Sequence, residues 1–228
     1  MNRTPLCSIV CCVVLLAGIF STDIFSTGVF STGGIPRAAA ASLTSYVKKY
    51  RAIRVSPEQE KRLARYRCLI EYFAAFSYIL PHHKVNPDFI RALILAESNG
   101  DAMARSNRDA RGLTQIIYAT GRQAAQELLQ KRIRFRYVSR RKLANLRPAD
   151  LYNPAVNILL ACYLIAKYNY QHQGKLDLVV SAWNAGEYSI VGNKPAQYKE
   201  TLNHIGKVNG YFIYFLKEKN RRRYAYRR

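Results

Sequence analysis

The stretch of sequence that decides the fold is NPDFIRALILAES, which occupies residues 86–98. It opens in the way that helices open. Asn86 is a favourable N-cap, Pro87 suits the first helical position, and Asp88 lies beside the free backbone amides of the first turn. The pattern therefore predicts a helix over this stretch.

The same helix carries a carboxyl group on its apolar face. Ile90, Leu93 and Ile94 fall on one face at helical spacing. Glu97 comes seven, four and three residues after them and so continues that face. A carboxylate there is costly unless it is paired or protonated, and desolvation raises the pKa of a carboxyl towards the range in which it donates a proton at neutral pH. Two interpretations stay open: a buried Glu97 satisfied by Arg or backbone amides, and a proton donor.

Other parts of the chain show the same helical pattern, and strand signals are scarce. Residues 42–85 are helical in pattern and basic, with Ser56 as the cap of a helix that begins at Pro57. Alternation of Val, Ile and Thr is rare, and hairpin turns marked by Gly are absent from the pattern. We expect a mainly α domain. Further helices are expected after Asn153-Pro154 over Ile158–Tyr170, ending near Gly174, and over Leu176–Trp183, ending at Gly186.

Composition sets the size and the charge of the protein. The chain has 228 residues, of which 49% are apolar or aromatic, enough for one packed domain of ordinary size. Lys and Arg number 36 against 14 Asp and Glu, which gives a formal net charge of +22. Such a charge suits a polyanionic partner: nucleic acid, an anionic membrane surface or a bacterial wall polymer. Charge alone does not choose among them.

Residues 1–41 have the pattern of an export signal. Arg3 is a thin positive region, Leu6–Phe20 is an apolar run of 15 residues, and Ala38–Ala41 supply the small residues that a signal peptidase needs. The linker between the run and the Ala cluster makes this signal longer than usual. We therefore keep two interpretations, a cleaved signal peptide and an uncleaved N-terminal membrane anchor. Both predict export to the periplasm or cell envelope.

The cysteines do not indicate a metal site. Three of the five lie in the first apolar stretch, and the other two are not spaced as zinc ligands are. Cys162 lies in a strongly apolar helical run, which favours a small buried hydrophobic side chain. A disulfide between Cys68 and Cys162 is the alternative in an oxidising compartment. No cofactor and no metal are expected.

The residues after Glu97 form a longer motif. Residues 97–120 read ESNGDAMARSNRDARGLTQIIYAT, with the acid, a Ser nine positions later, a GLTQI block and an AT pair in close order. This segment resembles the catalytic segment of the soluble lytic murein transglycosylase (SLT) family, lysozyme-like enzymes that cleave peptidoglycan. Further blocks agree with the family in the same order: VNPDFIRAL over 85–93, Asn153-Pro154 with Asn157-Ile158, AWNAG over 182–186, and a closing helix with Glu200-Thr201, Ile205, Val208 and Tyr211.

The resemblance covers roughly residues 86–214, a little over half of the chain, and implies a lysozyme-like helical fold of the goose-type or SLT kind. It divides the chain into four parts. These are 1–41, a signal peptide or N-terminal anchor with its linker; 42–85, a basic helical extension; 86–214, the SLT-like catalytic domain; and 215–228, a basic C-terminal tail.

The resemblance also implies a reaction. In the family a single Glu acts as acid and base, and by position that residue is Glu97. It would protonate the oxygen that leaves when the MurNAc–GlcNAc β-1,4 bond breaks. The N-acetyl group of the substrate takes the place of a second carboxylate, and the same Glu97 deprotonates the C6 hydroxyl, which closes a 1,6-anhydro ring without water. If Asp101 or Asp109 faced Glu97 across the cleft, a hydrolase would be favoured instead.

Positions in the motifs imply five substrate-binding residues: Ser106, Gly112, Gln115, Trp183 and Asn184. Ser106 and Gln115 would hydrogen-bond the substrate near the reaction centre, and Gly112 would let the backbone approach the cleft. Their residue types also fit turn and capping roles, so that reading stays open. For Asn184 we favour a structural role that braces the end of its helix.

Four residues depart from the family pattern. Trp183 replaces a Tyr whose phenol lies near the catalytic Glu, and an indole N–H donates a hydrogen bond but accepts none. Thr114 and Tyr118 replace the usual Met and Pro. His204 stands where a Tyr is common, and we expect it on the helix surface rather than in the cleft.

Three functions compete. The first is an exported peptidoglycan lytic transglycosylase whose partner is the peptidoglycan glycan strand, with membrane association if the N-terminal anchor is kept. The second, supported by Trp183, is a catalytically weakened peptidoglycan-binding module of a secretion or wall-remodelling apparatus. The third is a nucleic-acid binder led by the basic tail. It is disfavoured, and no specific nucleic acid is expected, because the export signal and the sugar-cleaving residues would then be accidents.

Overall fold

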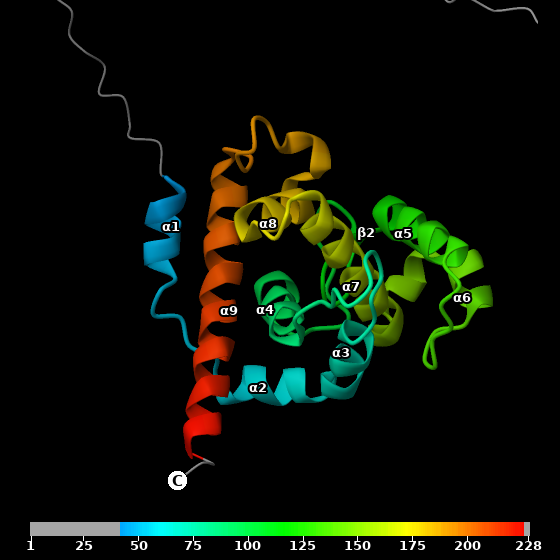
Figure 1. Ribbon diagram of the computed structural model, residues 1–228, viewed down its shortest axis with the longest axis horizontal. Helices are drawn as coiled ribbons and strands as arrows, with labels where there is room; N and C mark the ends of the chain where they lie inside the picture. Colours follow the sequence, from blue (N-terminus) through cyan, green and yellow to red (C-terminus); the bar gives the residue numbers. More distant parts are fainter. Residues whose placement is uncertain (1–41, 226–228) are drawn as a thin grey trace, which may run out of the picture. The chain divides into compact units, whose positions relative to one another are not determined.

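The computed structural model describes residues 42–225, so the predictions for residues 1–41 lie outside the described residues. Helices dominate this part of the chain, as predicted, beside one small antiparallel sheet (Figure 1). None of the described helices is long and apolar enough to cross a membrane. The elements are α1 (Leu43–Lys49), α2 (Pro57–Ala64), α3 (Arg67–Ala74), α4 (Pro87–Ser98), β1 (Ala110–Arg111), β2 (Ile116–Ile117), α5 (Tyr118–Gln130), α6 (Arg140–Ala144), the 3-10 helix η1 (Pro148–Tyr152), α7 (Pro154–Gln171), α8 (Leu176–Ala185), the 3-10 helix η2 (Glu187–Ser189) and α9 (Lys199–Ala225).

Helix α4 lies among the other helices, with α9 on one side and α3 and α7 on the other (Figure 1). Its predicted start is confirmed, because the Asn86 side chain accepts a hydrogen bond from the Asp88 N–H at 2.9 Å. Asn99 ends it in a left-handed conformation, with φ at 55°. Most of its residues are buried, since neighbours cover it on several sides. A carboxyl in its last turn is therefore held in a rigid frame.

Helix α7 is buried along most of its length. The Asn153 side chain accepts hydrogen bonds from the backbone N–H groups of Ala155 and Val156, at 2.9 and 3.3 Å, so the predicted start is confirmed. Cys162 on α7 is fully buried, whereas Cys68 on α3 is exposed, and both thiols are free. The alternative of a disulfide between them is wrong, because α3 presents Cys68 to solvent while α7 buries Cys162.

Two other predicted boundaries are confirmed. Helix α2 begins at a capping box, in which Ser56 Oγ accepts from the Gln59 N–H and Gln59 Oε1 accepts from the Ser56 N–H, at 3.3 and 2.9 Å. Helix α8 ends at Gly186, whose φ of 89° suits a residue without Cβ.

The basic extension over residues 42–85 packs on the rest of the domain. Helix α1 lies along α9 (Figure 1) and meets it at two glycines. A Cβ on Gly206 would lie 2.7 Å from the Tyr46 carbonyl oxygen, and one on Gly210 would lie 2.6 Å from that of Tyr50. The two helices thus approach closely because α9 has no side chain there, and the extension forms a helical layer rather than a free arm.

The C-terminal segment is helical. Helix α9 runs without a break to Ala225, so the segment expected as a basic tail over 215–228 continues this helix as far as that residue. The reason is packing: Phe215 is buried, and the Arg91 guanidinium of α4 lies 4.0 Å from the centre of its ring. These contacts support the last turns of α9 in spite of their basic composition.

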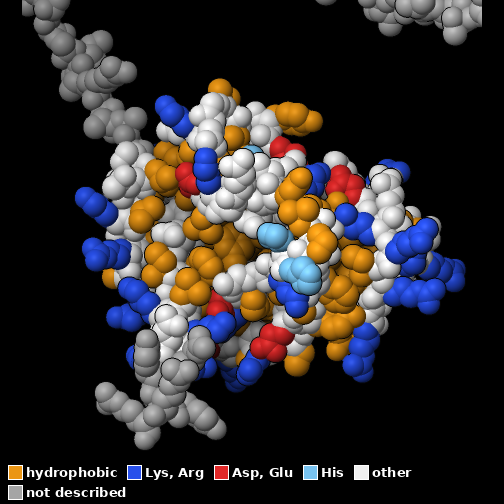
Figure 2. All heavy atoms as spheres, viewed as in Figure 1, with side chains coloured by type: hydrophobic (Ala, Val, Ile, Leu, Met, Phe, Trp, Pro, Cys, Tyr) orange, Lys and Arg blue, Asp and Glu red, His pale blue; other side chains and the backbone are white. Residues whose placement is uncertain are grey.

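The surface is mainly positive, in keeping with the composition. Figure 2 shows Lys and Arg side chains around the rim of one face, with a dense group over α5 and α6, and apolar side chains nearer the centre. Acidic side chains are few on this face, and several of them lie beside basic ones.

Candidate active site

Glu97 lies in the last turn of α4, where α8 and α9 each contribute one side chain to it. The indole Nε1 of Trp183, on α8, donates a hydrogen bond to Glu97 Oε1 at 2.8 Å. The imidazole Nε2 of His204, on α9, lies 3.2 Å from the same oxygen. Within the described part of the chain no hydrogen bond reaches Oε2. One carboxyl oxygen is therefore held by the protein, and the other is free to meet a ligand.

The position of His204 differs from the predicted place on the helix surface. Its side chain is only 11% exposed, because α4 and α8 pack against α9. Nε2 is buried within ion-pair distance of Glu97 but without the alignment of a hydrogen bond. The helical pattern of α9 could not reveal this contact, since it depends on how α9 crosses the end of α4.

Glu97 opens onto a cleft of about 580 Å³. The cleft also takes in four of the five residues that the motifs implied as substrate-binding, namely Ser106, Gln115, Trp183 and Asn184. A second cavity, of about 710 Å³, shares Trp183 and Glu200 with the first and continues over Gly186 and Tyr198. The two form one groove, and an open groove admits a polymer strand.

The loop between α4 and α5 forms one wall of the cleft and is held by its own polar side chains. Ser106 Oγ accepts hydrogen bonds from the backbone N–H groups two and four residues further on, at 3.2 and 3.1 Å. Gln115 Nε2 donates to the carbonyl oxygens of Ala104 and Gly112, at 3.1 and 2.9 Å. Ser106 and Gln115 thus shape the loop and line the cleft at the same time.

Gly112 is not among the residues that line the groove, which corrects the prediction that it lets the backbone approach the cleft. Its φ is +76°, and a Cβ would lie 2.2 Å from the Leu151 carbonyl oxygen and 2.6 Å from Asn157 Nδ2. The close approach that needs glycine is therefore towards η1 and α7.

Asn157 fastens this loop to the core. Its buried Oδ1 accepts hydrogen bonds from the backbone N–H and the hydroxyl of Thr114, at 2.9 and 2.7 Å. Its Nδ2 donates to the carbonyl oxygens of Arg111 and Leu151, at 3.0 and 2.8 Å. Three of these bonds are buried and the one to Arg111 is partly buried, so they hold the loop in one shape beside Glu97.

Asn184 has two roles. It lines the cleft, and its Oδ1 accepts a hydrogen bond from the Thr201 hydroxyl at 2.8 Å. This bond ties the end of α8 to the start of α9. The bracing contact that the sequence suggested for Asn184 is therefore present.

Neither Asp101 nor Asp109 lines the groove. Asp101 Oδ1 accepts a hydrogen bond from the Met103 N–H at 2.8 Å. The Asp109 carboxylate lies 2.7 Å from the Arg111 guanidinium, and this bond, with help from Arg105, lowers the pKa of Asp109 although desolvation opposes the shift. Both carboxylates serve the loop, so neither meets the condition that would favour a hydrolase.

Glu200 is a second carboxylate in the groove that the sequence interpretation placed only in a closing helix. Its Oε2 lies 3.4 Å from the Arg108 guanidinium, and both side chains are largely exposed. Glu200 shares a helix face with His204, which it precedes by four residues, but the sequence held no signal that this face meets the groove.

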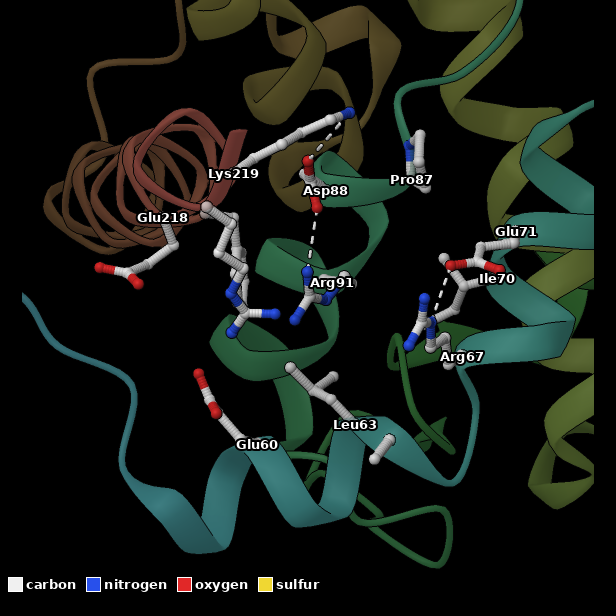
Figure 3. Close-up of a pocket in the computed structure, with 13 residues that line it drawn as sticks. Glu60, Leu63, Arg67, Ile70, Glu71, Pro87, Asp88, Arg91, Glu218 and Lys219 are labelled. Atoms are coloured by element: carbon white, nitrogen blue, oxygen red, sulfur yellow. Dashed lines mark hydrogen bonds and ion pairs between the residues drawn. The ribbon is translucent and has the colours of Figure 1, made fainter. Parts of the chain in front are cut away.

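Figure 3 shows another cavity, of about 450 Å³, which α2, α3, α4 and α9 line. Its charges are largely paired: Asp88 lies 3.0 Å from Arg91 and 3.9 Å from Lys219, and Arg67 lies 2.9 Å from Glu71. Of these pairs, Asp88–Lys219 joins α4 to α9, and the other two lie within one helix each. The cavity lacks the meeting of carboxyl, indole and imidazole that marks the cleft.

The chemistry available at the cleft is acid–base chemistry. A mostly buried carboxyl with one oxygen fixed, on a side chain that lines a groove, can give a proton to a bound ligand and take one back. Among the described residues, no group of three or more His, Cys, Asp or Glu side chains could hold a metal ion.

Comparisons with known proteins show the family and the fold of the chain. The chain matches the profile of the transglycosylase SLT domain over residues 75–205. A search of curated protein sequences finds no match. Among solved structures, an inactive mutant of the lytic transglycosylase Slt from Pseudomonas aeruginosa aligns with a TM-score of 0.52 and 19% identity, over 78% of this chain and 28% of its own. The 70-kDa soluble lytic transglycosylase in complex with bulgecin A gives 0.53 and 18%, over 69% of this chain and 25% of its own.

These likenesses show a lysozyme-like fold. Because the profile covers more than half of the chain, the protein belongs to the transglycosylase SLT domain family. The chain spans about a quarter of the length of the two lytic transglycosylases with which it aligns.

Proposed function

We propose that this protein is a peptidoglycan lytic transglycosylase that cleaves the MurNAc–GlcNAc β-1,4 bond and forms 1,6-anhydro-MurNAc. The observation that carries the proposal is the placement of Glu97, with Oε1 bound to Trp183 and the side chain open to a groove. Membership in the SLT domain family supports the substrate class, and the names of the two aligned lytic transglycosylases support the reaction class.

Glu97 is the single acid and base of the proposed reaction. First, protonated Glu97 gives its proton to the glycosidic oxygen as the bond from that oxygen to C1 of MurNAc breaks. The carbonyl oxygen of the N-acetyl group bonds to C1, which leaves an oxazolinium ion beside the Glu97 carboxylate. Next, Glu97 takes the proton of the C6 hydroxyl while that oxygen bonds to C1 and the oxazolinium ring opens. Glu97 ends protonated, and no water is consumed.

The held oxygen supports both steps. The indole N–H of Trp183 donates to Oε1, and a donor of this kind favours the carboxylate over the neutral acid. It therefore assists the loss of the proton to the leaving oxygen. It also fixes the carboxyl plane, so that Oε2 meets first the glycosidic oxygen and then the C6 hydroxyl.

Product analysis tests the proposal. Full-length protein and its Glu97→Gln variant would be incubated with isolated murein sacculi, and the soluble products weighed by mass spectrometry. Muropeptides that end in 1,6-anhydro-MurNAc, present with the wild type and absent with the variant, are the expected result. Products with reducing ends would instead mean hydrolysis, with Glu200 as the carboxylate to replace next.

A second function, a peptidoglycan-binding module with weakened catalysis, is favoured by Trp183 standing where the family has Tyr. Its signature in the same experiment is retention on sacculi without any soluble product. Glu97→Gln would then bind as well as the wild type does.

The cellular location is proposed from the sequence alone. The pattern of residues 1–41 supports export to the periplasm or cell envelope, with a cleaved signal or with an anchor that keeps the protein at the membrane. Sequencing the N-terminus of the protein isolated from its own cells distinguishes the two forms, and recovery from the cytoplasm with Met1 in place would contradict both.

A further inference from the structure

His204 lies against Glu97 in a place that water hardly reaches. The two side chains are 11% and 14% exposed, and Nε2 is 3.2 Å from Oε1. Nε2 has no aligned hydrogen-bond partner in the part of the chain that the structure describes. Buried ring nitrogens are normally satisfied. An ion pair between a His204 imidazolium and the Glu97 carboxylate would satisfy this nitrogen.

The charge of Glu97 changes in just this way during the proposed reaction, on which this inference rests. Glu97 is neutral before it gives up its proton, and it is a carboxylate while the oxazolinium ion exists. A group that attracts the carboxylate more than the neutral acid lowers the barrier between these states. An imidazolium at 3.2 Å, in a place of low exposure, is such a group, whereas a neutral imidazole attracts the carboxylate far less.

We propose that protonated His204 is a positioning residue that stabilises the carboxylate form of Glu97, so that the rate of cleavage depends on the protonation of His204. Trp183 acts on the same oxygen through an N–H that does not titrate. Trp183 therefore supplies the part of the stabilisation that is constant with pH, and His204 supplies the part that varies.

The charged neighbours on the same side of α9 act in opposite directions. Lys207, one turn after His204, donates from Nζ to the Ala96 carbonyl oxygen at 2.8 Å, and its charge opposes a second cation nearby. Glu200, one turn before His204, favours the imidazolium, although its carboxylate is engaged with Arg108 at 3.4 Å. Of these groups, Glu97 is the one within ion-pair distance of His204.

Among the residues that the structure describes, neither Glu97 nor His204 forms an ion pair with any other side chain. Helix α8 faces this pair with Trp183 and with the amide of Asn184, neither of which titrates. Helix α1 reaches α9 through the Lys49 ammonium and the Tyr50 hydroxyl, which both donate to Asn203 Oδ1, at 3.1 and 3.0 Å. Those bonds go to the residue before His204.

The first test needs no catalysis. The ring C–H signals of the four histidines would be followed against pH by NMR, and His204→Gln identifies the His204 signal. In Glu97→Gln we expect the His204 ring to lose its proton at a lower pH than in the wild type, because a neutral amide does not stabilise the imidazolium. Glu200→Gln is the matched control and should shift the signal less. An unchanged titration in Glu97→Gln overturns the proposal.

The second test measures kcat on soluble glycan strands from about pH 5 to about pH 8, a range that spans the titration of an ordinary imidazole. The wild type should lose rate as pH rises. His204→Gln should be slower by roughly tenfold or more at the acid end, and the ratio of the two rates should approach one as pH rises. Trp183→Phe should be slower than the wild type by the same factor at every pH.

A loss in His204→Gln that is the same at every pH would mean a merely structural role and would overturn the proposal. If the wild type cleaves no murein at any pH, the proposed function has failed. In that case the NMR titration still decides whether His204 and Glu97 interact as inferred.

Discussion

At the scale of single residues, the two substitutions nearest the reaction centre keep one property in common. Trp183 and His204 stand where the family commonly has Tyr, and both contact Oε1 of Glu97. A phenol donates a hydrogen bond to a carboxylate, and so does an indole N–H. Trp183 thus keeps a donor at Oε1, and His204 adds a group within ion-pair distance. The departures from the family pattern therefore do not by themselves argue for lost activity.

Trp183→Phe tests the indole N–H, the hydrogen-bond donor to Glu97 that does not titrate. The change removes the N–H but keeps an aromatic ring, so kcat should fall roughly tenfold or somewhat more, the worth of one hydrogen bond to a charged group. Thermal unfolding should change little, because Trp183 is only partly buried. Cleavage rates on sacculi and the melting temperature measure the two effects. Full activity in the variant would show that the indole bond is not needed.

At the scale of elements, the loop between α4 and α5 and the short β1–β2 pair hold the cleft wall against η1 and α7. Asn157 contributes four hydrogen bonds to this junction, and Gly112 allows the backbones to touch. The helices that carry Glu97, Trp183 and His204 pack on one another, α4 and α8 each against α9, and this packing sets the distances around Glu97. The loop sets the opposite wall, where Ser106 and Gln115 meet the ligand space.

Gly112→Ala is expected to destabilise the fold by about 3 kcal/mol or more, because the added Cβ would overlap a carbonyl oxygen that cannot move away easily. Gly192→Ala is the matched control, since Gly192 also has a positive φ, of 58°, but has open space around it. It should cost only about 1 kcal/mol of backbone strain. Urea unfolding of both variants gives the comparison. Equal costs would show that the contact at Gly112 relaxes freely.

At the scale of the whole molecule, the stability of this strongly positive chain depends on its few carboxylates. Desolvation alone would raise the pKa of Asp150, but the Lys142 ammonium at 2.8 Å and the Arg147 N–H outweigh it and lower that pKa. Desolvation would also raise the pKa of Glu127, but hydrogen bonds from Tyr163 and Lys167, among others, outweigh it and lower that pKa. These carboxylates join α5, α6, η1 and α7 to one another.

Acid should therefore destabilise the folded protein through the protonation of these carboxylates. A carboxylate whose pKa is lower in the folded state than in the unfolded state contributes stability above its unfolded pKa, and this is lost as pH falls through the folded value. We expect the free energy of unfolding to fall as pH drops below about 4. Asp150→Asn should be less stable at neutral pH and lose less on acidification. Denaturant titrations at neutral and acid pH measure the free energy of unfolding of both proteins. If the variant and the wild type lose equal stability on acidification, Asp150 does not contribute to the pH dependence.

Much of the fold and part of the site could be predicted from the chain itself. Helix starts at Ser56, Asn86 and Asn153 were predicted correctly, because a cap and its first turn interact within a few residues of one another. The motif after Glu97 indicated the family, and the structure brings most of the residues it implied into one cleft. These signals are local, because each depends on residues that lie close together in the sequence.

The remainder depended on tertiary packing. Trp183 meets Glu97 across 86 residues of chain, and His204 joins them because α9 crosses the end of α4, which no periodicity within α9 could reveal. The same packing buries Phe215 and extends α9 beyond the expected start of the tail. The amino-acid sequence by itself thus determined which helices form, the family and the position of Glu97 on the apolar face of its helix. Only the tertiary structure decided which side chains surround Glu97, because contacts between distant helices arise from burying their faces together.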